Sequence, residues 1–121
     1  DSDAAFIAAV AVSIRRILVD HARVRDAAKR PPRSRRVQID LDDMVASPDT
    51  LLELDELMTK LKTRNPTIAQ VIELQVFAGL SAREIGQIVG LNEKTVRSYR
   101  DAGRAWLRSQ IWDVDREDDN G

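Results

Sequence analysis

Apolar residues recur at steps of three and four along the first quarter of the chain, the spacing that places side chains on one face of an α-helix. Ser2 or Asp3 is suited to cap the start of that helix. The pattern predicts a helix over residues 4–28 whose apolar stripe comprises Ile7, Val10, Ile14, Ile17, His21 and Val24, widened by Phe6 and Leu18, and whose opposite face carries Arg15, Arg16, Arg23 and Asp26.

The segment after residue 29 ends this helix. Pro31 and Pro32 each lack a backbone donor, and Pro31 disfavours the helical conformation at Arg30. We expect a linker over residues 30–49, first basic and then acidic. Its basic part, from Lys29 to Arg36, either contacts phosphates or keeps the linker extended, and its alternating part at 37–41 is a candidate extended segment docked on a neighbour.

Helix start and stop signals follow one another at short intervals from residue 50. Thr50 and Glu53 have the spacing of a capping box, and Asn65 precedes Pro66, which suits the first position of a helix. One helix is therefore expected from about residue 50 and another from 66 to Gly79. Their apolar positions are Leu51, Leu54, Met58, Leu61, Ile68, Val71, Ile72, Leu74 and Phe77.

Two more helices are predicted downstream. Ser81 and Glu84 form a second capping-box spacing, which opens a short helix that ends at Gly90. Asn92 is suited to cap a last helix running to about residue 112. The apolar positions of this helix are Val96, Ala102 or Gly103, Trp106, Leu107 and Ile111, and we expect Trp106 and Trp112 in the core.

These elements predict an all-α fold with a long N-terminal helix, a linker and a four-helix domain that contains a helix-turn-helix. The expected boundaries are an amphipathic helix over 1–29, a charged linker over 30–49, the four-helix domain over 50–112 and an acidic tail over 113–121. The tail, with five acidic residues between Asp113 and Asp119, is expected to be disordered, or alternatively to shield the last helix in the free protein.

Composition excludes several kinds of protein. The 121 residues include no cysteine and one histidine, which excludes disulfide scaffolds, thiolate zinc sites and cysteine nucleophiles. No apolar run approaches the roughly 20 residues that a membrane helix needs, so we expect a cytoplasmic protein. The acidic pairs, such as Asp42 and Asp43, lie in a polar linker without a pocket. We therefore expect a protein that is not an enzyme and uses no cofactor or metal.

Charge is strongly segregated although the net charge is only −1. Residues 12–38 contain nine lysines and arginines against two acids, whereas residues 39–56 contain seven acids and no base. Residues 94–108 contain five bases against Asp101. Alternating blocks of this kind indicate basic surfaces that bind polyanions. Acidic segments of the same chain can mask such surfaces.

The predicted pair of helices around Gly90 carries the clearest functional signal. Ile85, Leu91 and Val96 are placed to hold the two helices at a steep angle, with Gly86 allowing their close approach. The start of the last helix would then project outward. Its outer residues are able to donate to phosphates or base edges, and they predict a DNA-binding surface of Lys94, Thr95, Arg97, Ser98 and Arg104.

Residues 71–81 (VIELQVFAGLS), 90–92 (GLN) and 95–98 (TVRS) resemble the helix-turn-helix region in the fourth domain of bacterial sigma-70-type sigma factors, specifically the extracytoplasmic-function group. Residues 17–23 (ILVDHAR) resemble the closing helix of that family's second domain, and 105–107 (AWL) fit the same subgroup. The resemblance covers most of residues 6–29 and 50–112.

The resemblance implies roles for particular residues. In this family the recognition helix enters the major groove of the minus-35 promoter element, which corresponds here to Lys94, Thr95, Arg97, Ser98 and Tyr99. Arg83 would meet a phosphate, and the helices from Thr50 to Phe77 would pack on the flap of the polymerase β subunit. Two residues depart from the family pattern: Arg100 replaces a usually apolar residue, and Glu93 places an acid beside the base-reading positions.

Only the closing helix of the second domain is recognisable, so we expect this polypeptide not to start transcription alone. A helix separated from its own domain exposes an apolar stripe. We therefore expect residues 4–28 to pack on the C-terminal domain or to form a homodimer, with His21 as a packed or interfacial residue.

Three functional interpretations remain open at this point. The first is a sigma factor, or part of one, that binds promoter DNA and RNA polymerase core. The second is a free-standing helix-turn-helix regulator that dimerises through residues 4–28 and binds half-sites about 34 Å apart. The third is a module that binds a partner such as an anti-sigma protein without contacting DNA.

Overall fold

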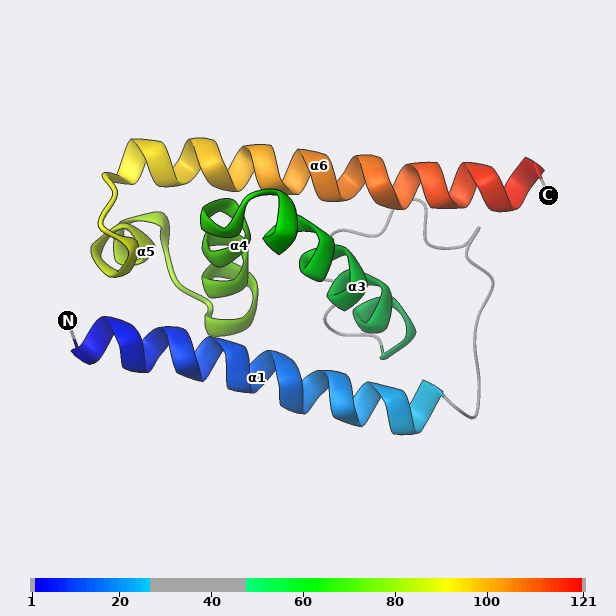
Figure 1. Ribbon diagram of the computed structural model, residues 1–121, viewed down its shortest axis with the longest axis horizontal. Helices are drawn as coiled ribbons and strands as arrows, with labels where there is room; N and C mark the ends of the chain where they lie inside the picture. Colours follow the sequence, from blue (N-terminus) through cyan, green and yellow to red (C-terminus); the bar gives the residue numbers. More distant parts are fainter. Residues whose placement is uncertain (1, 27–47, 121) are drawn as a thin grey trace.

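A computed structural model describes residues 2–26 and 48–120, and these ranges contain five α-helices and no strand (Figure 1). The helices are α1 (Ser2–Asp26), α3 (Pro48–Arg64), α4 (Pro66–Ala78), α5 (Ala82–Val89) and α6 (Glu93–Asn120). The prediction of an all-α fold is confirmed. The predictions made for residues 29–36 and 37–41 lie outside the described residues.

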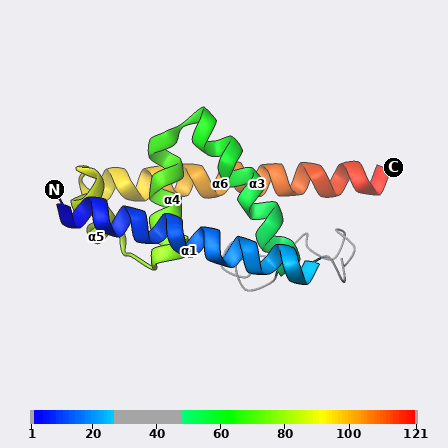
Figure 2. The same cartoon turned by 60° about the horizontal axis from the view of Figure 1, so that its bottom comes forward.

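The helices form three layers. The long helices α1 and α6 lie on opposite sides of the shorter helices α3, α4 and α5, as two views of the molecule show (Figures 1 and 2). Helix α1 packs against α3, α4 and α5, and α6 packs against the same three helices from the other side. The expectation that the N-terminal helix packs on the C-terminal domain is therefore confirmed.

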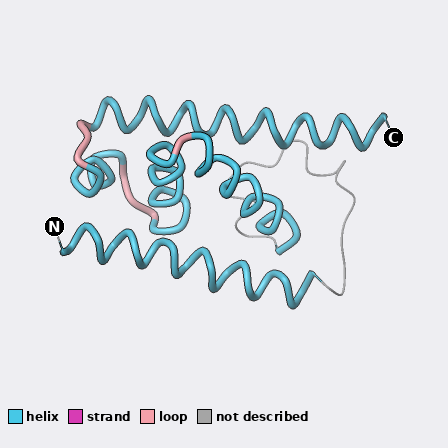
Figure 3. The backbone as a smooth tube through the Cα atoms, in the orientation of Figure 1, coloured by secondary structure: helices cyan, strands magenta, loops and turns pink. Residues whose placement is uncertain are grey.

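Local sequence signals set most of the helix ends, which short loops connect in Figure 3. The side chain of Asn65 accepts a hydrogen bond from the backbone N–H of Ile68 at 3.1 Å, with Pro66 at the first helical position of α4. Gly79 and Gly90 end α4 and α5 in the left-handed conformation, with φ of 69° and 77°. These caps agree with the sequence predictions.

Three predicted helix ends differ from the structure. Helix α1 begins at Ser2, two residues before the predicted start. Helix α3 begins at Pro48, two residues before the predicted start, so Thr50 lies inside the first turn and is buried. Proline suits that position because its missing N–H would have no partner there. Helix α6 continues to Asn120 instead of ending near residue 112, so the acidic segment is helical. Between residues 112 and 120 there is no proline or glycine to stop the helix.

The packed face of α1 agrees only in part with the predicted stripe. Ile7, Ile14 and Leu18 of that stripe pack half-buried against the core. Ala11, Val19 and Ala22 are the buried residues of α1, while Ile17 and Val24 are 59% and 77% exposed. His21 is exposed rather than packed. Arg15, predicted on the solvent face, points into the molecule and forms ion pairs with acids of α3 and α4. The helix is rotated toward its small residues because these allow the closest approach and because Arg15 finds its partners there.

The core consists of two neighbouring clusters. The first joins α1, α3, α4 and α6, and the second joins α1, α4, α5 and α6. Gly103 lies where α6 crosses α4: a methyl group added there would come within 2.8 Å of side-chain carbons of Ile68 and Ile72. Trp106 is half-buried against the first cluster, with the Arg64 guanidinium 5.6 Å from its ring centroid. The fully buried large side chains are Leu54, Met58, Val71, Ile72, Leu74, Ile85, Val96 and Leu107.

Candidate nucleic-acid interface

The connection between α5 and α6 is a three-residue turn, Gly90–Asn92, closed by hydrogen bonds to a single carbonyl. The backbone N–H groups of Gly90 and Leu91 donate to the Gly86 carbonyl oxygen at 2.9 and 3.1 Å. A methyl group at Gly86 would lie 2.5 Å from the Leu91 carbonyl oxygen. The turn therefore requires glycine at position 86, as the sequence indicated, and the left-handed φ of Gly90 ends α5 there.

Apolar contacts hold the two helices together beside this turn. Ile85 of α5 and Val96 of α6 are both completely buried in the second core cluster. Because the apolar residues on this side of α6 are in the core, the opposite side of its first turns is left toward solvent. Lys94, Arg97 and Ser98 are exposed there.

The first turn of α6 is capped by Asn92, whose side-chain oxygen accepts the backbone N–H of Thr95 at 2.8 Å. Glu93, in the same turn, forms an ion pair with Arg97 one turn later, with side chains 40% and 59% exposed respectively. Exposed pairs of this kind contribute about 0.3–0.5 kcal/mol. The Glu93 carboxylate therefore orients Arg97 without preventing it from binding another anion.

The start of α5 is capped by a reciprocal pair of hydrogen bonds. The Ser81 backbone N–H donates to the Glu84 carboxylate at 2.9 Å, and the Ser81 hydroxyl accepts the Glu84 backbone N–H at 3.2 Å. These hydrogen bonds lower the pKa of Glu84 below its ordinary value, the one from the Ser81 backbone more than the one with the Ser81 side chain. They do so because they favour the charged carboxylate. Arg83 is exposed in this capped first turn.

The remaining predicted DNA-binding residues are less accessible. Thr95 is half-buried, and Tyr99 is half-buried against the second core cluster. Arg104 is half-buried, and its guanidinium donates to the Gln75 side-chain oxygen of α4 at 3.2 Å. The structure thus brings Lys94, Arg97 and Ser98 together on one exposed surface and places Tyr99 and Arg104 at its margin.

Two further arginines belong to this side of α6. Arg100, noted in the sequence only as a departure from the family pattern, is 28% exposed and lies 3.8 Å from the Asp101 carboxylate. Arg108 is exposed two turns further on. Successive residues of an α-helix are rotated by 100° about its axis, so both arginines fall within one 120° sector together with Lys94, Arg97 and Arg104. The three- and four-residue spacing of these cations in the sequence is the signal that identifies Arg100 and Arg108. We call this set the basic face: Lys94, Arg97, Arg100, Arg104 and Arg108.

The acidic end of α6 lies far from the first turns of this helix. Residue 113 follows Lys94 by 19 residues, which is about 29 Å along a continuous helix. In this structure the acidic segment therefore does not shield the first turns of α6, contrary to one of the sequence expectations.

In the part of the chain that the structure describes, no helix is both long and apolar enough to cross a membrane. No curated protein and no solved structure matches the chain. A family model, ECF sigma factor, matches residues 1–113, nearly the whole chain. The chain therefore belongs to the ECF sigma factor family, the members of which act in transcription initiation.

Proposed function

We propose that this protein recognises the minus-35 promoter element through the first turns of α6 and binds RNA polymerase core through α3 and α4. The observation that carries the DNA-binding part is the exposed, capped start of α6 with Lys94, Arg97 and Ser98 on one surface. Family membership supports transcription initiation in general. This function requires no catalysis and no cofactor, and it belongs in the cytoplasm.

Each side chain of the surface has a distinct proposed role. Arg97 reads a base edge, because an arginine guanidinium matches the two acceptors of guanine. Lys94 and Ser98 donate to bases or to neighbouring phosphates. Arg83 donates to a phosphate at the amino end of α5, where the helix dipole also favours an anion.

The residues at the margin act differently. Tyr99, Thr95 and Arg104 are half-buried, so they contact DNA only along one edge of the surface. The hydrogen bond to Gln75 fixes the direction of the Arg104 guanidinium before DNA binds. Arg104 therefore suits a phosphate contact that positions the helix rather than one that reads sequence.

The test compares Arg97→Ala with wild type on DNA selected from a random library. If Arg97 reads a base, affinity falls by about 1–3 kcal/mol and the preference at one position relaxes. If Arg97 contacts only phosphate, preference stays unchanged and the slope of log affinity against log salt falls by about 0.9. Fluorescence anisotropy at several salt concentrations measures both quantities.

Arg23→Ala is the matched control, since Arg23 is an equally exposed arginine on α1, on the side of the molecule away from α6. It should leave affinity and salt slope close to wild type. Failure to enrich any sequence, or equal affinity of wild type and Arg97→Ala, would contradict recognition through α6.

A second candidate function rests on the exposed apolar residues Phe6, Ile17 and Val24 of α1, which we call the outer ridge. This ridge would serve a free-standing dimeric regulator that binds paired half-sites. Cooperative binding to a palindrome, without capture of polymerase core, would favour this second function. Capture of core and binding to a single asymmetric element favour the first, and capture of an anti-sigma protein is compatible with it.

A further inference from the structure

A half-buried ion cluster joins α1 to α3 and α4. Arg15 of α1 donates through Nε to the Asp55 carboxylate at 2.6 Å and through Nη1 to the Glu73 carboxylate at 3.0 Å. Its Nη2 donates to the Asp55 backbone carbonyl at 3.0 Å and to the Thr59 hydroxyl at 3.1 Å. The side chains of Arg15, Asp55 and Glu73 are only 15–19% exposed. This Arg15 cluster is the polar centre of the contact between α1 and the rest of the molecule.

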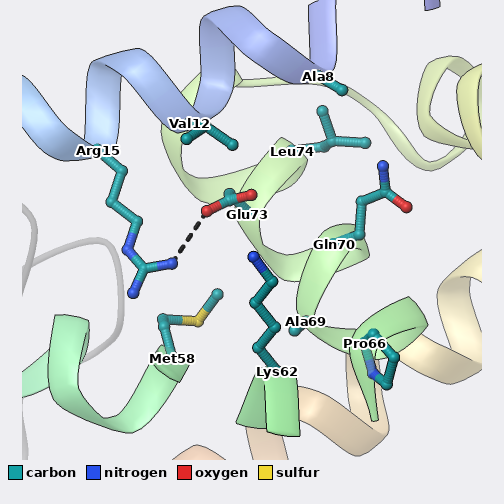
Figure 4. A pocket seen from close by; sticks show the side chains of 10 residues that line it. All are labelled: Ala8, Val12, Arg15, Met58, Lys62, Pro66, Ala69, Gln70, Glu73 and Leu74. Atoms are coloured by element: carbon teal, nitrogen blue, oxygen red, sulfur yellow. Dashed lines mark hydrogen bonds and ion pairs between the residues drawn. The ribbon is translucent and has the colours of Figure 1, made fainter. Parts of the chain in front are cut away.

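The apolar contact beside the Arg15 cluster combines small buried residues with larger half-buried ones. Ala11, Val19 and Ala22 of α1 are buried. Larger residues of the same helix pack half-buried against the core, namely Ile7, Ile14 and Leu18. Two open grooves, of about 250 and 420 Å³, follow the seam between α1 and the α3–α4 pair on either side of Arg15. Figure 4 shows the first groove, with Arg15 and Val12 of α1 facing Glu73 and Lys62 across it.

The seam between α4 and α6 is different. There the side chains of Ile68 and Ile72 leave no room for even a methyl group on Gly103. The α1 seam therefore differs from the α4–α6 seam in being bordered by open grooves and centred on a polar cluster. Its polar contacts can also be replaced by another cationic side chain.

We propose that α1 is a displaceable occupant of the α3–α4 face and that it competes there with RNA polymerase core. This inference rests on the proposed function, which assigns α3 and α4 to polymerase binding. The polymerase element that replaces α1 is a helix with an apolar face and an arginine or lysine at its centre. That cation is needed because Lys62, which lines the same grooves, supplies one positive charge against the two carboxylates of Asp55 and Glu73.

The arrangement makes polymerase binding separable from DNA binding. Helices α1 and α6 lie on opposite sides of the molecule (Figures 1 and 2). Displacing α1 therefore exposes the α3–α4 face without removing the exposed Lys94 and Arg97 of α6 from the DNA surface. The fraction of molecules with α1 displaced sets the apparent affinity for polymerase.

The first test is Arg15→Ala in the whole chain. Loss of the Arg15 contacts weakens α1 docking, so the apparent affinity for bacterial RNA polymerase core should rise about five- to thirtyfold. Affinity for selected promoter DNA should stay unchanged. Arg16→Ala is the matched control, because the neighbouring Arg16 is exposed and does not take part in the Arg15 cluster, and it should leave both affinities at wild-type values.

The second test holds α1 in place and does not depend on the stability of Arg15→Ala. The chain has no cysteine, so Ala8→Cys with Gln70→Cys introduces one thiol on α1 and one on α4, both lining the first groove. A short, cleavable cross-linker with two thiol-reactive groups then joins the two cysteines. Linking should lower polymerase affinity at least about tenfold, and cleavage of the reagent should restore it.

The outcomes separate the two proposals. Competition by α1 is overturned if the linked protein binds polymerase core as tightly as the cleaved protein. It is also overturned if Arg15→Ala, shown to be folded by circular dichroism, binds core no more tightly than Arg16→Ala. In both cases the proposed function stands. If no form of the protein binds polymerase core, with Arg15→Ala and the cleaved protein included, the proposed function itself is wrong.

Discussion

Gly86 and Arg15 show how single residues decide the geometry of this protein in different ways. Gly86 is required by its immediate surroundings, since the Leu91 carbonyl occupies the space of its missing methyl group. That role was visible in the sequence because both residues belong to one local turn. Arg15 is required by partners 40 and 58 residues away. Nothing in the local pattern around Arg15 distinguished it from the neighbouring Arg16, which is exposed.

Replacing Gly86 by alanine should destabilise the α5–α6 turn by about 1–3 kcal/mol, the usual cost of forcing extra volume into a packed site. Here the obstacle is a backbone carbonyl, which cannot rotate away as a side chain does. Chemical denaturation measures the effect. Gln87→Ala, at the exposed next residue, should change stability by no more than about 0.5 kcal/mol. Equal stability of the two variants would mean that the turn is looser than described.

At the scale of helices, short capping motifs were correct at both ends of α4 and α5 and at the start of α6, whereas the Thr50 capping box did not mark the start of α3. Asn65, Ser81 and Asn92 each cap the helix that the sequence assigned to them. These caps depend on hydrogen bonds within four residues, so short motifs contain all the information needed. The end of α6 had no such motif. The change from apolar to acidic residues near 112 marked a change of environment, and helix formation continued across it.

The capping box of α5 should make stability depend on pH through Glu84. Its pKa is lowered in the folded protein by the hydrogen bonds with Ser81, so the unfolded chain binds the proton more readily and stability falls as the carboxyl is protonated. Wild type should therefore melt above Glu84→Gln at neutral pH. The difference should close as pH falls through the lowered pKa of Glu84.

Thermal melts between pH 7 and pH 2.5 measure this difference. Glu56→Gln, which removes an exposed acid within α3 but no cap, is the control and should follow the wild-type profile more closely. A constant gap between wild type and Glu84→Gln at every pH would show that the carboxylate charge does not contribute.

At the scale of the whole molecule, α1 has two apolar sides. One side, with Ala11, Val19 and Ala22, is buried against the other helices, and the outer ridge of Phe6, Ile17 and Val24 is exposed. Helical periodicity identified an amphipathic helix correctly and placed Ile7, Ile14 and Leu18 on its packed side, but it also placed the exposed outer ridge there. When apolar residues cover so much of a helix surface, the sequence pattern does not specify which part packs against the rest of the chain and which part stays exposed.

Two substitutions with similar helix propensity test this orientation. Val19→Ser should cost at least about 2 kcal/mol, because it removes buried apolar volume and buries a hydroxyl. Ile17→Ser should change stability by at most about 0.5 kcal/mol. Urea denaturation measures both, and light scattering of the same samples reports association. Conversion of a wild-type dimer to a monomer by Ile17→Ser would identify the outer ridge as a dimer interface.

The sequence by itself determined the number and order of the described helices, the caps of α4, α5 and α6, the glycine turn and the cationic residues at the start of α6, because each depends on contacts between residues close in the chain. Its resemblance to ECF sigma factors was confirmed by the family match. Only the tertiary structure decided which side of α1 is buried, that Arg15 joins α1 to α3 and α4, and that Tyr99 and Arg104 are half-buried. Those features depend on how helices far apart in sequence approach one another, and that approach is set by side-chain volumes and charges on both partners together.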